Sequence, residues 1–304
     1  MKKILVIGSS GFVGRRVAQA LLADGYVVRC LARTPAKVED LAALGCEVVQ
    51  GDMNDLASLQ RALESVDAAY IAIHTLSPQG AGTAGQGFMD VEMQGVQNIV
   101  AACRTNGVNR LLYVTFLGTA PDGPSAWIRG RWQTEQVLLQ SGLDVTIIRP
   151  GQIVGVDGQG FDMLAAQARH STAMIMGSGR QKFRTIALDD LVYYLVGVLD
   201  EPRANGQSYD VGSDDILTAD QMIDVAAAVL GRKQPRKIHI PQEFLVTLAP
   251  LIERLTKIPN GAFRGLLDGM LADMIGDPAP IRTILPRPLR SYRQAAEEAL
   301  TKQQ

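Results

Sequence analysis

The sequence predicts an α/β protein with a doubly wound parallel sheet and a smaller, mostly helical lobe at its C-terminal end. Three observations lead to this prediction. A short apolar run, Ile4–Ile7, ends at a glycine-rich turn that opens a helix-compatible segment. Apolar runs then alternate with helix-periodic segments from residue 3 to 150, which demands a parallel sheet because helices must cross between its strands. Beyond residue 240 the pattern changes to amphipathic segments rich in Leu, Ile and Met.

The alternation assigns the elements in order. Predicted strands are short apolar runs bounded by turn residues, and they cover 4–7, 26–31, 46–50, 68–73, 110–115 and 144–148. Predicted helices have apolar residues three or four apart, and they cover 12–23, 35–44, 57–63, 89–105 and 127–140. In the C-terminal part we expect helices over 217–231, 242–256 and 261–275, with Thr218 as an N-cap, and a short edge segment at 238–241.

This pattern predicts a Rossmann-type domain at residues 1–155, with residues 182–213 folding back onto it, and a smaller substrate or partner lobe at 156–304. The Leu- and Met-rich helices of that lobe are expected to form a core, and alternatively a dimer face or an apolar pocket. Four arginines near the end either grip an anionic substrate or lie on a solvated surface. They are Arg282, Arg287, Arg290 and Arg293.

Composition excludes several classes of protein. With 304 residues, 47% hydrophobic content and a net charge of −1, the chain is typical of globular proteins and has no basic field for nucleic acid. The apolar run Leu191–Leu199 is too short to span a membrane, and the run after Met1 is too short for a signal peptide. Cys30, Cys46 and Cys103 lack metal-ligand spacing, so buried thiols in a reducing compartment are expected. We therefore expect a cytoplasmic protein that needs no metal.

The glycine turn predicts a dinucleotide site. Glycines recur at Gly8, Gly11 and Gly14, directly behind the first strand. Gly8 permits a tight turn, Gly11 lets the backbone approach a pyrophosphate, and Gly14 allows close packing of the helix. The amides at the start of that helix then face the phosphates. The expected contacts also include Ser10, Phe12 and Val13.

Residues after the next strands are candidates for the rest of the cofactor. Arg33 stands nineteen residues beyond Gly14, about where such sites read the ribose, and a guanidinium there favours the 2′-phosphate of NADP(H) over NAD(H). Alternatively Arg33 is a solvated residue that opens the second helix. Asp52 and Met53 either flank the adenine or, in the case of Asp52, turn the chain towards a helix capped by Asn54 or Asp55.

The fourth and fifth strands contribute further candidates at their carboxyl ends, the edge where open α/β sheets bind ligands. Ile73 and His74 end the fourth strand. His74 acts as a donor or general acid near the nicotinamide, or it is a histidine bonded to loop backbone. Residues 75–87 are rich in Gly, Ser, Thr, Ala and Pro, which predicts a mobile loop over the site. Thr115 places a hydroxyl at the end of the fifth strand.

Several segments together resemble the short-chain dehydrogenase/reductase superfamily, and most of all its atypical NmrA-like, NAD(P)H-binding branch. They are VIGSSGFVG, VNRLLYVTFLG, SGLDVTIIRPGQIVG, FRTIALDDLVYYLVGVL and GQSYDVGSDDILTADQMIDVAAAVLGR. The resemblance covers roughly residues 1–240 and implies a Rossmann fold and a nicotinamide cofactor. It also implies that the turn around Pro150, Gly151 and Ile153 contacts the nicotinamide.

The resemblance also marks a departure. The family uses a Tyr-x-x-x-Lys pair on the helix after the fifth strand, and Trp127 and Arg131 occupy those positions here. Tryptophan has no O–H to deliver a proton, and arginine stays charged. Arg131 can still hydrogen-bond a ribose or polarise an acceptor, alongside Thr115 and His74. Trp127 is expected to pack under the loop or to wall a substrate pocket.

Two functions follow. The first is an NADP(H)-dependent oxidoreductase, a reductase of a small carbonyl or quinone-like compound. The second is a non-catalytic NADP(H)-binding sensor, regulator or assembly factor with a protein partner, motivated by the replaced catalytic pair. For either we expect a monomer or homodimer with no nucleic-acid partner and no membrane span.

Overall fold

The computed structural model describes residues 1–73, 87–256, 261–269 and 272–302. By their internal contacts the residues divide into two compact units. We call Met1–Thr115, Gly130–Ile148 and Val192–Ser208 the N-terminal unit, and Phe116–Arg129, Arg149–Leu191 and Tyr209–Gln304 the C-terminal unit. The bounds expected for the two domains, 1–155 and 156–304, stay a prediction.

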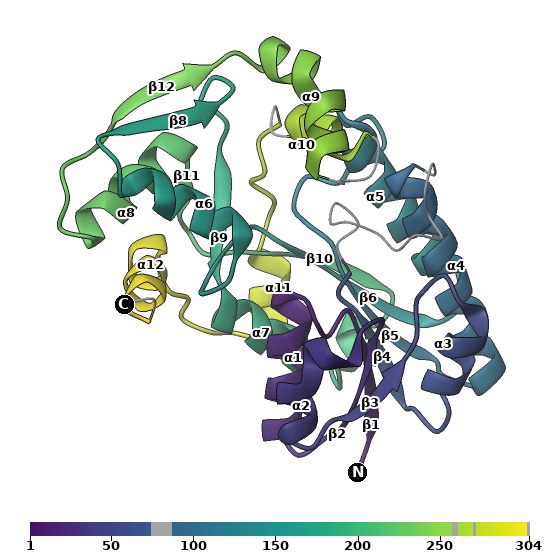
Figure 1. Ribbon diagram of the computed structural model, residues 1–304. Helices are drawn as coiled ribbons and strands as arrows, with labels where there is room; N and C mark the ends of the chain where they lie inside the picture. Colours follow the sequence, from purple (N-terminus) through teal and green to yellow (C-terminus); the bar gives the residue numbers. More distant parts are fainter. Residues whose placement is uncertain (74–86, 257–260, 270–271, 303–304) are drawn as a thin grey trace. The chain divides into compact units, whose positions relative to one another are not determined.

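A seven-stranded sheet has the order β10-β6-β5-β4-β1-β2-β3 (Figure 1). Its strands are β1 (Lys3–Ile7), β2 (Val27–Ala32), β3 (Glu47–Gln50), β4 (Ala68–Ile71), β5 (Arg110–Val114), β6 (Asp144–Pro150) and β10 (Gln207–Val211). Neighbours from β6 to β3 run parallel, which confirms the doubly wound α/β prediction. The order reverses between β1 and β4, and ligands of such sheets bind at the carboxyl ends of strands at this reversal.

The connecting helices are α1 (Phe12–Ala23), α2 (Glu39–Ala43), α3 (Leu56–Ala62), α4 (Phe88–Asn106) and α5 (Ala126–Leu139), with a 3₁₀ turn η1 (Pro35–Val38) before α2. The helix predicted over 35–44 is therefore two short pieces. Val38 adopts φ −130°, outside the helical range, and this separates them. The core of the sheet is built from apolar side chains such as Leu5, Ile99 and Leu111, all fully buried. The cysteines Cys30, Cys46 and Cys103 are buried and free, as expected.

The C-terminal unit contains two small sheets that the sequence reading largely missed. One has the order β11 (Ile216–Leu217), β9 (Phe183–Ala187) and β7 (Gln152–Val154), and the other pairs β12 (Arg236–Ile240) with β8 (Thr172–Met176). The unit also contains helices. They are α6 (Gln159–Ala168), α7 (Leu188–Gly197, shared with the N-terminal unit), α8 (Ala219–Val229), α9 (Gln242–Thr256), α10 (Ala262–Gly269), α11 (Ala279–Ile284) and α12 (Tyr292–Thr301). A 3₁₀ turn, η3 (Pro202–Ala204), belongs to the N-terminal unit.

Helix ends in this unit agree with the expected caps in one case and differ in another. Thr218 is the N-cap of α8 and forms a capping box with Gln221. The helix predicted over 261–275 is too long, because α10 ends at Gly269. Met274 exchanges backbone hydrogen bonds with the β9 region, accepting from Arg184 and donating to the carbonyl of Lys182, so its backbone is unavailable to a helix.

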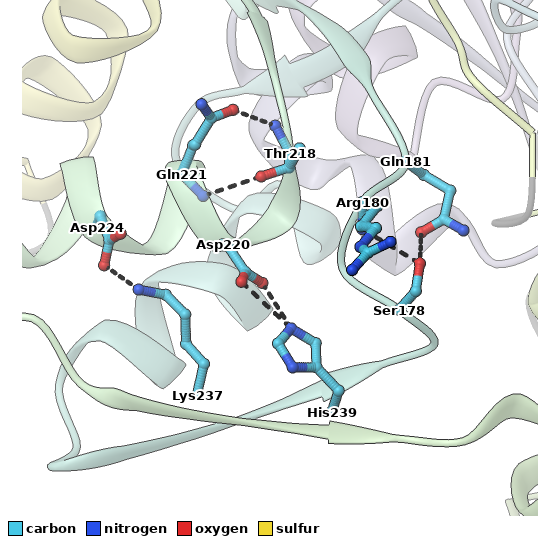
Figure 2. A network of polar contacts seen from close by, with 9 residues as sticks. All are labelled: Ser178, Arg180, Gln181, Thr218, Asp220, Gln221, Asp224, Lys237 and His239. Atoms are coloured by element: carbon cyan, nitrogen blue, oxygen red, sulfur yellow. Dashed lines mark hydrogen bonds and ion pairs between the residues drawn. The ribbon is translucent and has the colours of Figure 1, made fainter.

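Figure 2 shows how β12 is attached to α8. His239 Nε2 lies 3.1 and 3.2 Å from the two carboxylate oxygens of Asp220, and Lys237 forms an ion pair with Asp224. Side chains two apart on the strand thus meet side chains four apart on the helix, which fixes the register between them. Within the described residues, we find no helix with the length and apolar character that a membrane crossing requires.

Candidate functional site

The turn between β1 and α1 requires glycine at two of its three positions. Gly8 has φ +95°, and a Cβ there would lie nearer than 3.0 Å to the carbonyl oxygen of Ala72. A Cβ on Gly14 would lie equally close to the carbonyl oxygen of Gly8. The first turn of α1 therefore sits directly on the backbone of the turn, closer than any side chain would permit. The sequence placed Gly14 against the strand, and the structure places it against the turn that follows the strand.

The N-terminus of α1 is open to a ligand. Gly11 is its N-cap and provides no side-chain hydrogen bond to the first amides. Ser10 and Gly11 are exposed, while Phe12 and Val13 are half-buried. An uncapped helix start directs unsatisfied N–H groups and the positive end of the helix dipole at the space in front of it. The diphosphate contacts expected from Gly8 to Gly14 stay a prediction, and an uncapped helix start is a kind of site that binds phosphate groups.

Arg33 is the first residue after β2, and its side chain is 49% exposed. Its Nε lies 3.9 Å from Asp52 Oδ2, a wide contact that leaves the guanidinium free to turn. Asp52 itself uses Oδ1 to accept the backbone N–H of Asn54 at 2.8 Å, so it stabilises the turn after β3. Asp55 caps α3 by accepting from Ala57 and Ser58.

Two further cofactor candidates lie deeper. Met53 is 8% exposed and packs against Gly95 of α4, where a Cβ would meet its side chain. Ile73, just after β4, is partly buried, and its carbonyl accepts from Arg131 Nη2 at 3.3 Å. His74 and the loop expected at 75–87 lie outside the described residues up to position 86. The cofactor contacts of Met53, Ile73 and His74 therefore stay predictions.

Arg131 lies in a buried polar triangle with Glu92 of α4 and Tyr113 of β5. Arg131 Nε is 3.1 Å from Glu92 Oε1, an ion-pair distance without hydrogen-bond alignment. Arg131 Nη1 donates to Tyr113 Oη at 2.7 Å, and Tyr113 Oη donates to Glu92 Oε1 at 2.8 Å. The Arg131 side chain is 2% exposed and that of Glu92 is fully buried.

The environment fixes the protonation of this triangle. Burial raises the pKa of Tyr113 well above its usual range, ahead of the opposing effect of Arg131. Burial is the largest single effect on Arg131 and lowers its pKa, but Glu92, Tyr113 and Glu135 together outweigh it, so the net pKa is raised. Arg131 therefore stays a cation and Tyr113 a neutral phenol. The sequence reading missed both partners, although a glutamate on the apolar face of a predicted helix was a usable signal.

Thr115 follows β5 in the N-terminal unit and is 9% exposed. Its backbone N–H donates to the carbonyl of Ile148 at 2.9 Å. Its Oγ1 is buried without a hydrogen-bond partner among the residues that the structure describes. An unsatisfied buried hydroxyl costs free energy, so this atom has unused hydrogen-bonding capacity.

The remaining candidates belong to the C-terminal unit. Trp127 is 7% exposed and stacks on Phe116 with ring centroids 3.9 Å apart. Gly151 donates its N–H to the carbonyl of Val211, and Pro150 accepts from Leu117. A Cβ on Gly151 would lie nearer than 3.0 Å to the carbonyl of Arg184, so this turn also requires glycine. Ile153, in β7, is half-buried. The nicotinamide contacts of Pro150, Gly151 and Ile153 stay predictions.

The arginines near the chain end do not share one partner. Arg287 and Arg290 both contact Asp190, which is 1% exposed, and Arg293 pairs with Glu297 one helical turn away. Arg282 instead contacts Asp214. Arg287 and Arg290 therefore anchor the chain before α12 to the start of α7, and no single anion grip is formed by the four.

A family model described as NAD(P)H-binding matches residues 8–201. The chain is 27% identical over 231 residues to the NAD(P)H azoreductase of Xenophilus azovorans, with 75% of this chain and 74% of the azoreductase covered. It is 29% identical over 157 residues to the Photosystem II assembly factor Ycf39 of Cyanophora paradoxa, with 51% of this chain and 47% of that protein covered.

Among solved structures, an NADPH-dependent quinone oxidoreductase from Escherichia coli in complex with NADPH superposes with a TM-score of 0.74. The two sequences are 20% identical, and the match covers 98% of this chain and 99% of that one. At this identity the likeness shows that the two proteins share a fold.

Proposed function

Because the chain belongs to the NAD(P)H-binding family, we propose that it binds NADP(H) in preference to NAD(H) and reduces a small carbonyl or quinone-like compound. The observation that carries the binding part is the uncapped, glycine-backed start of α1. The reductase part draws on the azoreductase relative and on the hydroxyl of Thr115.

Arg33 is the residue that selects the cofactor in this proposal. The diphosphate lies at the amides of residues 10–13, and the guanidinium of Arg33 pairs with the 2′-phosphate. Among the described residues, the contact that the Arg33 side chain has to give up is the one with Asp52 at 3.9 Å. Asp52 remains bonded to Asn54 and supports the turn.

NADPH supplies a hydride when it is bound. In this proposal the Thr115 hydroxyl, which is buried and unsatisfied among the described residues, donates a hydrogen bond to the oxygen of the acceptor. We assign Arg131 as a positioning residue, because its nitrogens already contact Glu92, Tyr113 and the carbonyl of Ile73. Its retained positive charge also favours negative charge that develops nearby. His74 stays a candidate donor at the end of β4.

Cofactor preference is tested by titrating NADP⁺ and NAD⁺ into wild type and Arg33→Ala. We expect wild type to bind NADP⁺ at least tenfold more tightly, a difference of about 1.4 kcal/mol, and Arg33→Ala to lose this preference. Arg61→Ala serves as the matched control, because Arg61 is an exposed arginine of the same unit on α3. Equal affinities in wild type would refute the assignment of Arg33.

Turnover is tested by NADPH oxidation with a panel of quinones, azo dyes and small carbonyl compounds. With any accepted compound, Thr115→Val should lower kcat by about 10²-fold, the typical loss when one donor to a developing oxyanion is removed. Thr115→Ser, which keeps the hydroxyl, should retain most activity. Full activity in Thr115→Val would remove Thr115 from the reaction.

A second function, binding without chemistry, is favoured by the replacement of the Tyr-x-x-x-Lys pair with Trp127 and Arg131, and by the relative that is an assembly factor. In that case the chain binds NADP(H) and a protein partner in a cofactor-dependent way. No turnover across the panel, together with a partner recovered only in the presence of NADPH, would favour this function over the reductase.

A further inference from the structure

A hollow of about 410 Å³ lies in the C-terminal unit, and none of its lining residues is assigned to the cofactor above. It is lined by Arg184, Asp214, Asp277, Pro278, Ala279, Arg282 and Thr283. Its volume is within the range of small-molecule sites. Its wall contains two guanidinium groups, of Arg184 and Arg282, and two carboxylates, of Asp214 and Asp277.

Arg184 lacks a carboxylate partner within ion-pair distance in the part of the chain that the structure describes. Its Nε donates to the carbonyl of Ile275 and its Nη1 to the carbonyl of Ser213, each at 2.6 Å. Its aliphatic stem runs across Gly212, where a Cβ would lie nearer than 3.0 Å to it. Burial, followed by the nearby charge of Arg282, lowers the pKa of Arg184. The side chain is therefore held in place by neutral acceptors, while Asp214, Asp277 and Asp210 offset part of its charge without a direct ion pair.

Arg282 has a carboxylate partner, Asp214, whose side chain can turn away from it into solvent. Arg282 Nη1 donates to Asp214 Oδ1 at 2.6 Å and Nη2 donates to the carbonyl of Gly212 at 2.7 Å. The Asp214 side chain is 89% exposed, so its carboxylate can turn into water at little cost. The Nε of Arg282 is buried and has no hydrogen-bond partner among the described residues.

The other carboxylate in the wall, that of Asp277, is hydrogen-bonded to the backbone. Asp277 Oδ1 accepts the N–H of Ala279 at 3.0 Å, and the N–H of Asp277 donates to Asp210 Oδ2 at 2.9 Å. Asp277 is thus fixed by the start of α11, whereas Asp214 is the carboxylate that an incoming anion would replace.

We propose that this hollow binds a small molecule through an oxyanion group, a phosphate monoester or a carboxylate, held between Arg184 and Arg282 in place of Asp214. Planar guanidinium groups match both oxyanions through paired N–H donors. The lining residues differ from those assigned to the nicotinamide cofactor, so the two sites are tested by separate substitutions.

The test uses the full chain carrying Arg33→Ala, which removes the proposed 2′-phosphate contact from the measurement. Inorganic phosphate and acetate are titrated separately by calorimetry. We expect saturable binding of at least one of them, and the preferred probe identifies the oxyanion. Arg184→Gln should weaken that binding at least tenfold, while Arg293→Gln, an exposed arginine of the same unit paired within its own helix, should leave it unchanged.

Asp214→Asn provides the second arm and does not rely on Arg184→Gln folding. Because it removes the competing carboxylate from Arg282, it should strengthen binding of the preferred probe several-fold and increase the rise in Tm that the probe causes. Absence of saturable binding of both probes, equal binding in Arg184→Gln, or weaker binding in Asp214→Asn would each overturn the proposal.

Discussion

Arg131 of the N-terminal unit and Arg290 of the C-terminal unit both pair with a carboxylate that water barely reaches, but the arginines differ in their own exposure. Glu92 is fully buried and Arg131 is 2% exposed. Asp190 is 1% exposed, whereas Arg290 is 29% exposed. A cation that loses its partner in the first unit stays in a dry environment, while in the second it turns to solvent. The two units therefore differ in how costly it is to break a charge pair.

The largest expected effect is in the N-terminal unit. Glu92→Leu should lower the free energy of unfolding by about 3–5 kcal/mol, because it removes the carboxylate 3.1 Å from the buried guanidinium of Arg131. Urea denaturation monitored by circular dichroism measures the loss. The double variant Glu92→Leu with Arg131→Met removes both charges and should recover more than half of it. A double variant no more stable than the single one would show that the pair does not act as proposed.

Removing the buried carboxylate of the C-terminal unit should lower the free energy of unfolding by less than Glu92→Leu does. Asp190→Asn should lower the free energy of unfolding by about 1–3 kcal/mol, since the amide can still accept from the backbone N–H of Arg290 and both arginines can reach water. The same denaturation experiment applies. A loss as large as that of Glu92→Leu would contradict the difference between the units.

Breaking the contact between β12 and α8 should lower the free energy of unfolding by less than either of these changes. His239 and Asp220 are 37% and 29% exposed, and exposed pairs contribute at most about 1 kcal/mol. Asp220→Asn should therefore change the free energy of unfolding by less than about 1 kcal/mol. Urea denaturation of wild type and variant measures the change, and a loss above about 2 kcal/mol would contradict the ranking.

The smallest effect is a pH dependence at the surface of the N-terminal unit. The hydrogen bond from Lys3, opposed by burial and assisted by Arg29, holds the pKa of Glu47 below its usual range. A carboxyl with a depressed pKa stabilises the fold above its unfolded pKa of about 4.3, and this contribution is lost as the pH falls through the folded value. Between pH 7 and 3, wild type should lose slightly more stability than Glu47→Gln. Identical pH profiles would exclude a contribution from Glu47.

The sequence was sufficient to predict helix bounds and caps that depend on a local pattern of residues. The bounds of α1 and α9 match the predicted ranges, and the caps of α3 and α8 include predicted residues, because period and cap chemistry act over a few neighbours. The range 261–275 was predicted too long, because Met274 pairs with a strand some ninety residues earlier in the chain. Local periodicity carries no information about such a pairing.

The same limit applies to the site. The glycine turn and the position of Arg33 could be read from spacing. The partners of Arg131 could not, since Glu92, Tyr113 and Arg131 come from α4, β5 and α5 and meet only in the folded sheet. Nor could spacing pair Arg184 with Arg282, which line one hollow from elements far apart in the chain.

The three segments of each unit alternate along the chain, so the backbone passes from one unit to the other five times. No single cut yields either unit as a contiguous fragment, and truncation after the first 155 residues would remove β10, the neighbour of β6. During synthesis the edge of the large sheet must wait until residue 211 has left the ribosome. Expression of the whole chain, or circular permutation that keeps every segment, is therefore the route to folded protein.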